Sequence, residues 1–244
     1  MQKLLASISI SFLTGLLSAP VYAATLTVPA TSDIFAAGLS TPPTLSGGGG
    51  TLPPVFSFSA NTGQILTFSN VIGSVSSDSV NFFGPDGINR EGTNLNSVGG
   101  ISGIVINGNN GFSLNGVFLD DSGQPSSAPP RLDFTNNTNF ASLPAPQLGQ
   151  TFFIGDGLTG TGTGQVQQFN VPVNATHLYL GFEDGSFSQG TPGTYSDNSG
   201  SLTATFDISG STVSVPEPSS TLGLLTFGAI GAGSWILRKM KKAN

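Results

Sequence analysis

Short segments in which apolar and polar residues alternate recur along the chain, and each is bounded by Gly, Pro or Asn. Alternation with a period of two places apolar side chains on one face of a β-strand, and the bounding residues are typical of turns. Such segments occupy residues 64–68, 103–106, 116–119, 151–154, 166–171, 177–182 and 201–206. Residues that favour helices are scarce between them, so the sequence predicts an all-β protein built as a sandwich or barrel.

The first 23 residues have the three parts of a secretory signal peptide. Lys3 supplies a positive charge, residues 4–17 form a short apolar stretch, and Val21-Tyr22-Ala23 places small residues where a signal peptidase cleaves. We expect cleavage after Ala23. The alternative, a buried N-terminal helix, is disfavoured because the apolar stretch is hydrophobic on every side.

The C-terminal end also has the pattern of a membrane-directed segment. Pro216-Glu217-Pro218 precedes an uncharged segment, residues 222–237, which ends at the basic cluster that begins with Arg238. Sixteen residues at 1.5 Å each make a helix of about 24 Å, slightly short of a hydrocarbon core of about 30 Å. Snorkelling cations can cover the difference, and they are expected on the cytoplasmic side. The sequence therefore predicts a transmembrane helix at 222–237.

These C-terminal features together resemble the PEP-CTERM sorting signal of bacteria that produce exopolysaccharide. The resemblance covers residues 216–244, with Pro216, Glu217, Pro218 and Arg238 as its defining positions. It implies a processing enzyme of the exosortase type, a transient membrane anchor, and delivery to the cell surface or extracellular matrix. An ordinary, permanent C-terminal anchor is the alternative.

Residues 24–215 remain between the two ends and are long enough for one domain with a core. We expect the folded domain to cover 24–208, a stalk to cover 209–215, and loops to cover 46–50 and 120–130. This region contains twelve acidic residues and only two basic ones, Arg90 and Arg131, and this excess of negative charge argues against a nucleic-acid partner. The chain has no Cys, so packing or a bound metal must stabilise the exported domain instead of disulfides.

The densest group of polar residues lies in the loop from Gly181 to Gly200, between two predicted strands. Ca²⁺ takes six to eight hard oxygen ligands, which Asp, Asn and Thr side chains provide on an adaptable loop. The same residue types are also common in ordinary turns. Composition alone leaves both interpretations open.

The segment Pro192-Gly193-Thr194-Tyr195-Ser196-Asp197-Asn198-Ser199-Gly200-Ser201 resembles the calcium loop of the PA-I type galactophilic lectins, which reads P-G-T-Y-G-N-N-S-G-S. Segments 73–77, 83–87, 153–157 and 168–172 extend the similarity over roughly residues 64–207. The resemblance implies a single jelly-roll-like β-sandwich. It also implies a Ca²⁺ ion that bridges the protein and the hydroxyl groups of a sugar.

Site residues follow from that resemblance by position. The calcium ligands would be Ser77 (through its carbonyl), Asp184, Thr194, Asp197 and Asn198. The family places a His and a Gln after its G-P-x-G turn to hold the sugar, whereas this chain has Glu91 and Asn94 at about those places. Asp86, Glu91 and Asn94 are therefore the candidate ligand-binding residues, and galactose specificity is not implied.

Two other functions are weighed against a calcium-dependent lectin. Catalysis is not expected, because the chain has no Cys and its single His, His177, lies within a predicted strand. The acidic neighbours Glu183 and Asp184 should point to opposite faces of a strand and so should not converge. A structural matrix protein, in which Ca²⁺ only stabilises the fold, remains the main alternative.

Overall fold

The computed structural model describes residues 23–45, 48–89, 91–106, 108–135 and 137–209, and it confirms the all-β prediction. The strands are β1 Ala24–Pro29, β2 Val55–Ser57, β3 Ile65–Ser76, β4 Thr93–Leu95, β5 Ile104–Ile106, β6 Asn115–Leu119, β7 Leu132–Asp133, β8 Ser142–Leu143, β9 Phe152–Phe153, β10 Leu158–Gly160, β11 Thr163–Val166, β12 Gln168–Asn170, β13 His177–Gly181, β14 Gln189–Gly190 and β15 Ser199–Ile208. Three short 3-10 helices are present: η1 Ile34–Ala36, η2 Ser186–Ser188 and η3 Tyr195–Asp197. Each of the seven segments predicted from alternation contains a strand.

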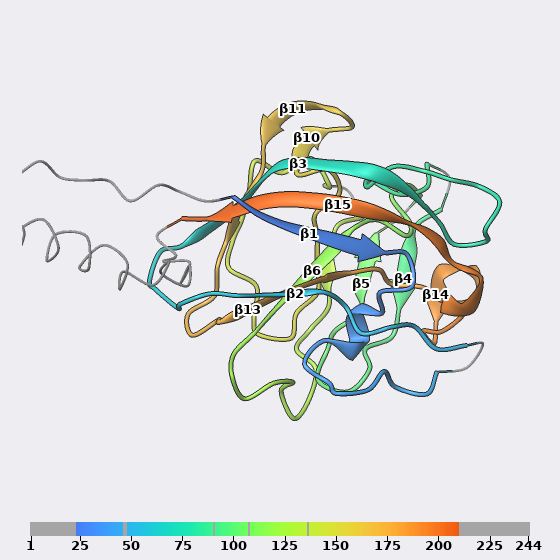
Figure 1. Ribbon diagram of the computed structural model, residues 1–244, viewed down its shortest axis with the longest axis horizontal. Helices are drawn as coiled ribbons and strands as arrows, with labels where there is room; N and C mark the ends of the chain where they lie inside the picture. Colours follow the sequence, from blue (N-terminus) through green and yellow to red (C-terminus); the bar gives the residue numbers. More distant parts are fainter. Residues whose placement is uncertain (1–22, 46–47, 90, 107, 136, 210–244) are drawn as a thin grey trace, which may run out of the picture.

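Two sheets pack face to face and enclose the main core (Figure 1). One has the order β1-β15-β3-β12-β8 and the other has the order β2-β13-β6-β9. Aromatic rings cross the space between them: Phe56 of β2 lies 5.3 Å from Phe206 of β15, and Phe152 of β9 lies 5.6 Å from Phe169 of β12, measured between ring centroids. In a chain without Cys, this aromatic packing supplies the cohesion that disulfides give many exported domains.

Two smaller sheets flank this pair. The strands β14-β4-β5-β7 form one of them, and the hairpin β10-β11 forms the other. Several pairings in the molecule are parallel, namely β12 with β8, β5 with β7 and β14 with β4. The jelly-roll connectivity implied by the lectin resemblance stays a prediction.

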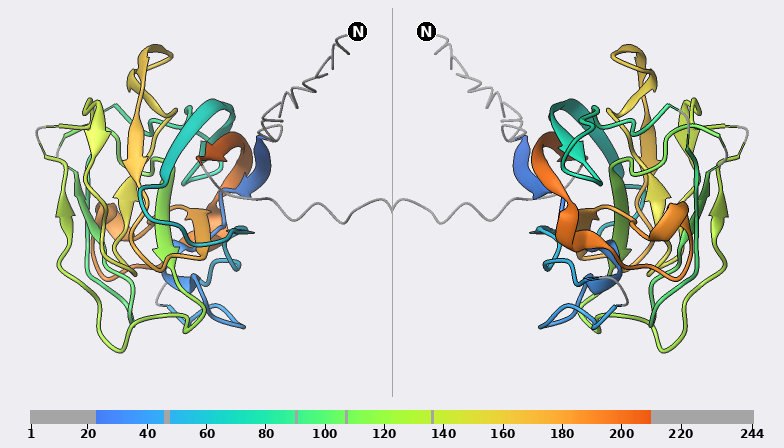
Figure 2. Two further views of the ribbon diagram at one scale, coloured as in Figure 1. Left: turned by 90° about the vertical axis from the view of Figure 1, so that its left-hand side faces the viewer. Right: turned by 90° about the vertical axis from the view of Figure 1, so that its right-hand side faces the viewer.

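Strands β1 and β15 set the two ends of the domain. They pair antiparallel from Ala24 opposite Phe206 to Pro29 opposite Ser201, and they lie side by side in Figure 2. At about 3.3 Å per residue, the ten residues of β15 span roughly 33 Å. The polar loop that ends at Asn198 therefore lies at one end of β15, and the chain leaves the described domain at the other end, at Ser209.

The predicted loop at 120–130 joins β6 to β7 and is anchored by Gln124. Its side-chain amide donates to the carbonyls of Phe35, at 2.9 Å, and Ala37, at 2.8 Å. Its side-chain oxygen accepts from the N–H of Gly100 at 3.1 Å. One side chain thus connects this loop to η1 and to the turn after β4.

We expect Gln124→Ala to lower the free energy of unfolding by about 2 kcal/mol, because three backbone groups lose a hydrogen-bond partner. Chemical denaturation of the full-length chain measures this change. Gln165→Ala is the matched control, since Gln165 is exposed and its side chain makes no hydrogen bond with the described residues. Equal stability of the two variants would contradict the anchoring role.

Several predictions fall on residues outside the described ranges. These are the signal peptide, residues 46–47 of the Gly-rich loop, nearly all of the stalk, and the helix at 222–237. Over the described part of the chain, no helix combines the length and the apolar character that crossing a bilayer requires.

Candidate functional site

The polar loop connects β13 to β15 and includes η2, β14 and η3. Tyr195 holds it against the sandwich: its ring is fully buried and its hydroxyl donates to the carbonyl of Phe182 at 3.0 Å. The N–H of Asp184 donates in turn to the Tyr195 hydroxyl at 3.3 Å. Thr194, just before η3, has a left-handed backbone with φ of 72°. This turn brings the end of the loop back toward its start.

The loop brings three other predicted calcium ligands close to Asp184, so that four of the five lie together. Burial raises the pKa of Asp184 to about 7, and the nearby side chain of Asn198, the N–H of Gly185 and the side chain of Thr194 partly oppose this rise. The charge of Asp197 raises the pKa of Asp184 further. The N–H of Gly185 donates to Asp184 Oδ1 at 2.7 Å. Residues up to 14 positions apart therefore converge on one carboxylate.

Several buried oxygens of this loop have no hydrogen-bond partner among the described residues, and two of them belong to predicted calcium ligands. These two are Asp184 Oδ2 and Asn198 Oδ1, on side chains that are 6% and 8% exposed. The other side-chain atom of Asn198, Nδ2, donates to the carbonyl of Ala30 at 3.2 Å, which fixes the direction of the amide oxygen. Buried polar atoms are nearly always satisfied in folded proteins, so such oxygens indicate a missing partner. A hard cation fits this oxygen chemistry.

The carboxylates in this group are few. Within the described ranges, no three His, Cys, Asp or Glu residues lie together in an arrangement that could hold a metal ion. The predicted ligand set needs only two carboxylates, Asp184 and Asp197, because amide, hydroxyl and carbonyl oxygens complete it.

Ser77, the fifth predicted ligand, lies next to this loop. Ser76 at the end of β3 pairs with Ser199 at the start of β15, so Ser77 follows directly beside Asn198. The hydroxyl of Ser79 donates to the carbonyl of Asp197. The loop after β3 therefore lies against the last turn of the polar loop.

A hollow of about 670 Å³ opens beside Ser77. Its lining residues are Ser77, Asp78, Asn81, Phe83, Ile88, Glu91 and Phe187. Glu91 also lines an adjoining hollow of about 320 Å³ together with Asn94 and Phe187. In that second hollow, Asn94 Oδ1 accepts from Arg131 Nη1 at 2.7 Å. Glu91 thus lies with Ser77 in one hollow and with Asn94 in the other, and the binding role of Glu91 and Asn94 stays a prediction.

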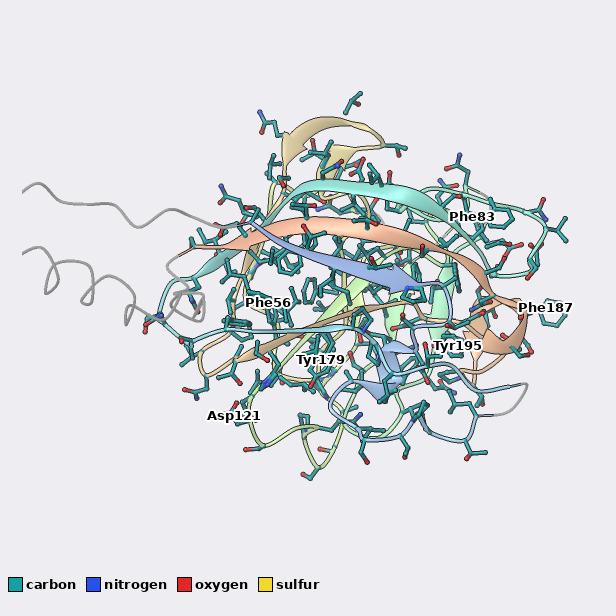
Figure 3. The ribbon with its side chains drawn as sticks, in the orientation of Figure 1. Phe56, Phe83, Asp121, Tyr179, Phe187 and Tyr195 are labelled. Carbon is teal, nitrogen blue, oxygen red and sulfur yellow. The ribbon has the colours of Figure 1, made fainter. Side chains whose placement is uncertain are left out.

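Phe187 was missed by the sequence analysis. Its side chain is 94% exposed and projects from the rim of the molecule, while Phe83 lies closer to the body (Figure 3). Its backbone is left-handed, with φ of 59°, which is a strained conformation for an aromatic residue. An exposed aromatic ring that lines two hollows and is held by a strained backbone is suited to contact a ligand.

Asp86 lies apart from these residues. Its Oδ1 accepts from the N–H of Asp156 at 2.9 Å. It lines a separate cavity of about 400 Å³ that has no lining residue in common with the hollow beside Ser77. The structure therefore separates Asp86 from Glu91 and Asn94, with which the sequence analysis had grouped it.

Two further carboxyl groups are buried near the loop. Burial raises the pKa of Glu183 well above its ordinary value and raises that of Asp33 to about 6. Asp33 Oδ1 caps η1 by accepting from the N–H of Phe35 at 2.9 Å. Glu183 lies near the backbone of Ile104, whereas Asp184 lies near Asn198 and Thr194. Glu183 and Asp184 thus have different hydrogen-bonding neighbours, and both lie near Tyr195.

His177 lies in β13 with two polar neighbours. Its Nδ1 is 2.8 Å from the hydroxyl of Thr176, which also lies 2.7 Å from Asp121 Oδ1. Asp121 and Phe187 lie far apart in Figure 3. The His177 group is therefore separate from the polar loop.

Comparison with protein-family models matches residues 214–239 to the PEP-CTERM protein-sorting motif. The C-terminal segment is a PEP-CTERM sorting signal. The match includes Pro216, Glu217, Pro218 and Arg238, so the sequence-based assignment is confirmed. The motif indicates an extracellular protein that exosortase processes and that is sorted to the cell surface or beyond. A search of curated proteins found no match.

Proposed function

We propose that the exported domain is a calcium-dependent, lectin-like protein that binds glycans of the exopolysaccharide or extracellular matrix. The observation that carries this proposal is the pair of buried, unpartnered oxygens, Asp184 Oδ2 and Asn198 Oδ1. They lie in the loop that resembles a lectin calcium loop, at the end of β15 opposite Ser209. The site thus lies at the end of β15 away from Ser209, the last residue that the structure describes.

In this proposal, Ca²⁺ is held by the side chains of Asp184, Thr194, Asp197 and Asn198 and by the carbonyl of Ser77. The ion would supply open coordination positions for vicinal sugar hydroxyls. The chain's own part is to fix the oxygens: Gly185 orients Asp184, and the carbonyl of Ala30 orients Asn198.

The hollow beside Ser77 would hold the rest of the sugar. Phe187 and Phe83 provide aromatic surface, and Glu91 and Asn81 provide hydrogen-bonding groups at its wall. Small polar ligands commonly bind where apolar surface and a few oriented polar groups converge. Asn94 lies in the adjoining hollow, where a second sugar residue would reach it.

The second candidate function is a structural matrix protein in which Ca²⁺ only stabilises the fold. The burial of Asp184 and Asn198 favours it, because a deeply held ion has fewer positions open to a ligand. A glycan array probed in Ca²⁺ and in EDTA separates the two functions. Glycan binding that disappears in EDTA supports the lectin. The matrix role predicts no glycan signal but a Ca²⁺-dependent rise in the melting temperature.

We expect Asp197→Ala to weaken Ca²⁺ binding about tenfold, a loss of roughly 1.4 kcal/mol, because one anionic ligand is removed at an exposed position. Calorimetric titration of the full-length chain with Ca²⁺ measures the affinity. Asp207→Ala is the control, since it removes the same charge near the other end of β15. An affinity unchanged by Asp197→Ala would remove this residue from the site.

Two finer features of the sorting pathway are also part of the proposal. The signal peptide would be cleaved after Ala23, which would leave Ala24, the first residue of β1, at the new N-terminus. The helix at 222–237 would anchor the chain in the membrane until exosortase acts at Pro216-Glu217-Pro218. The jelly-roll connectivity of the sandwich is proposed on the same lectin resemblance.

A further inference from the structure

The cavity that Asp86 lines is built from segments far apart in the sequence. Its polar lining includes Asp86, Asn89, Asn109, Asn110, Thr138 and Asn139, and Phe153, Leu158, Gly160 and Thr161 complete its wall. The loops after β3, β5 and β7 and the hairpin β10-β11 all contribute. An adjoining hollow of about 180 Å³ shares Asn109, Asn110, Thr138 and Asn139 with it. Together they form a polar groove in which amide groups predominate.

Hydrogen bonds inside the fold hold part of this groove in place. Asn110 Nδ2 donates to the carbonyl of Asp86 at 2.8 Å, and the Thr138 hydroxyl donates to Asn110 Oδ1 at 3.4 Å. Asp86 is itself fixed by the N–H of Asp156 at 2.9 Å. These contacts tie three of the contributing segments together, so the groove is largely formed before any ligand arrives.

Other amides in the groove are available for a ligand. Asn139 is exposed and lines both hollows. Its side chain makes no hydrogen bond with any described residue. Each side-chain amide offers two donors and one acceptor oxygen, which match the mixed donor and acceptor character of sugar hydroxyls. The described lining residues include one carboxylate and no Lys or Arg, which disfavours an anionic ligand.

We propose that this amide-lined groove is a second saccharide site, which binds neutral glycans without Ca²⁺. It shares no lining residue with the hollow beside Ser77, and none of the predicted calcium ligands lines it. The inference goes beyond the calcium-dependent site and does not rest on it. With both sites, one domain would engage two segments of polysaccharide and so cross-link the matrix. Binding at two sites raises the overall avidity without new contacts at either one.

Calorimetric titration of the full-length chain in EDTA tests the second site without the first. The probes are maltohexaose, cellohexaose, laminarihexaose and mannohexaose, with a hexamer of galacturonic acid as the anionic comparison. We expect at least one neutral hexasaccharide to bind and the acidic one not to bind. Asn139→Ala should weaken that binding at least tenfold, and Asp86→Asn should weaken it less. Asn96→Ala should leave it unchanged, because Asn96 is an exposed Asn that lines neither hollow.

Absence of binding by all four neutral probes in EDTA would overturn the proposal, as would binding that Asn139→Ala leaves intact. A melting temperature within a degree of the wild type confirms that the variant is folded. The calcium-dependent function is judged separately, by the signal that appears only in Ca²⁺. If the Ca²⁺-dependent signal is absent but binding in EDTA is observed, the calcium-dependent function is contradicted and the amide-lined groove is supported.

Discussion

Asp184→Asn should make the protein at least as stable as the wild type in EDTA and clearly less stable than the wild type in Ca²⁺. Without the ion, the wild type carries a buried carboxylate with one unpartnered oxygen, and the substitution removes that charge while keeping the shape. The new amide can also donate toward Asn198 Oδ1, which has no partner. With the ion, the wild type gains about 2.7 kcal/mol at a free Ca²⁺ concentration 100 times the dissociation constant, and the variant gains almost none.

Urea unfolding of both proteins, in EDTA and in Ca²⁺, measures this reversal. Asp207→Asn is the control variant, because it removes a charge near the far end of β15 and should respond to Ca²⁺ like the wild type. A variant at Asp184 that keeps the full Ca²⁺-dependent gain would exclude this carboxylate as a ligand. A variant that is unstable in both conditions would point to a purely structural role.

In EDTA, Asp184 and Asp33 together should contribute about 4 kcal/mol of added stability as the pH falls from 7 to 5. The pKa of Asp184 is raised from 3.8 to about 7, and that of Asp33 is raised from 3.8 to about 6. In the unfolded chain both carboxyl groups ionise near pH 3.8, whereas in the folded protein they stay protonated up to their raised pKa values. Stability is therefore lost as the pH rises from 3.8 to those raised pKa values. Between pH 7 and pH 5, the folded state holds a proton that the unfolded state lacks over nearly two pH units at Asp184 and over about one pH unit at Asp33. Each such proton contributes about 1.4 kcal/mol per pH unit, which gives about 4 kcal/mol in total.

Saturating Ca²⁺ should change this pH dependence. The ion favours the charged form of Asp184, so the protein is more stable at pH 7 with Ca²⁺ than in EDTA. At lower pH, protons compete with Ca²⁺ for the Asp184 carboxylate, so the affinity for Ca²⁺ falls. Denaturation curves at pH 5, 6 and 7, each with EDTA and with Ca²⁺, provide the test. A stability that falls from pH 7 to pH 5 in EDTA would contradict the raised pKa values.

The sequence predicted the long features of the fold because alternation is a strong signal in long strands. The sequences of β3, β13 and β15 show this alternation of apolar and polar residues, and all seven predicted segments contain a strand. β1 was missed because it follows the predicted cleavage site directly. The two-residue strands β7, β8 and β14 were missed because they are too short to show a period and depend on distant partners.

The grouping of the polar-loop residues could also be predicted, because that loop is nearly continuous in the sequence. Positions 194, 197 and 198 lie within one turn, and the pairing of β3 with β15 brings Ser77 to them. Asp86 could not be placed, since its position depends on contacts with the segments around Asn110 and Asp156. Phe187 did have a signal, a single aromatic residue within the polar run Ser186-Phe187-Ser188, but its exposure depends on the fold.

The most direct test of the central claim is a glycan array probed with the wild type and with Phe187→Ala, each in Ca²⁺ and in EDTA. We predict that the wild type binds neutral glycans in Ca²⁺ and loses this Ca²⁺-dependent signal in EDTA. Phe187→Ala should bind Ca²⁺ normally but bind those glycans at least tenfold more weakly, because the exposed ring no longer contacts the sugar. Val173→Ala, which truncates another exposed apolar side chain, should bind like the wild type. A wild-type glycan signal that is the same in Ca²⁺ and in EDTA, or no signal in either, would contradict the account.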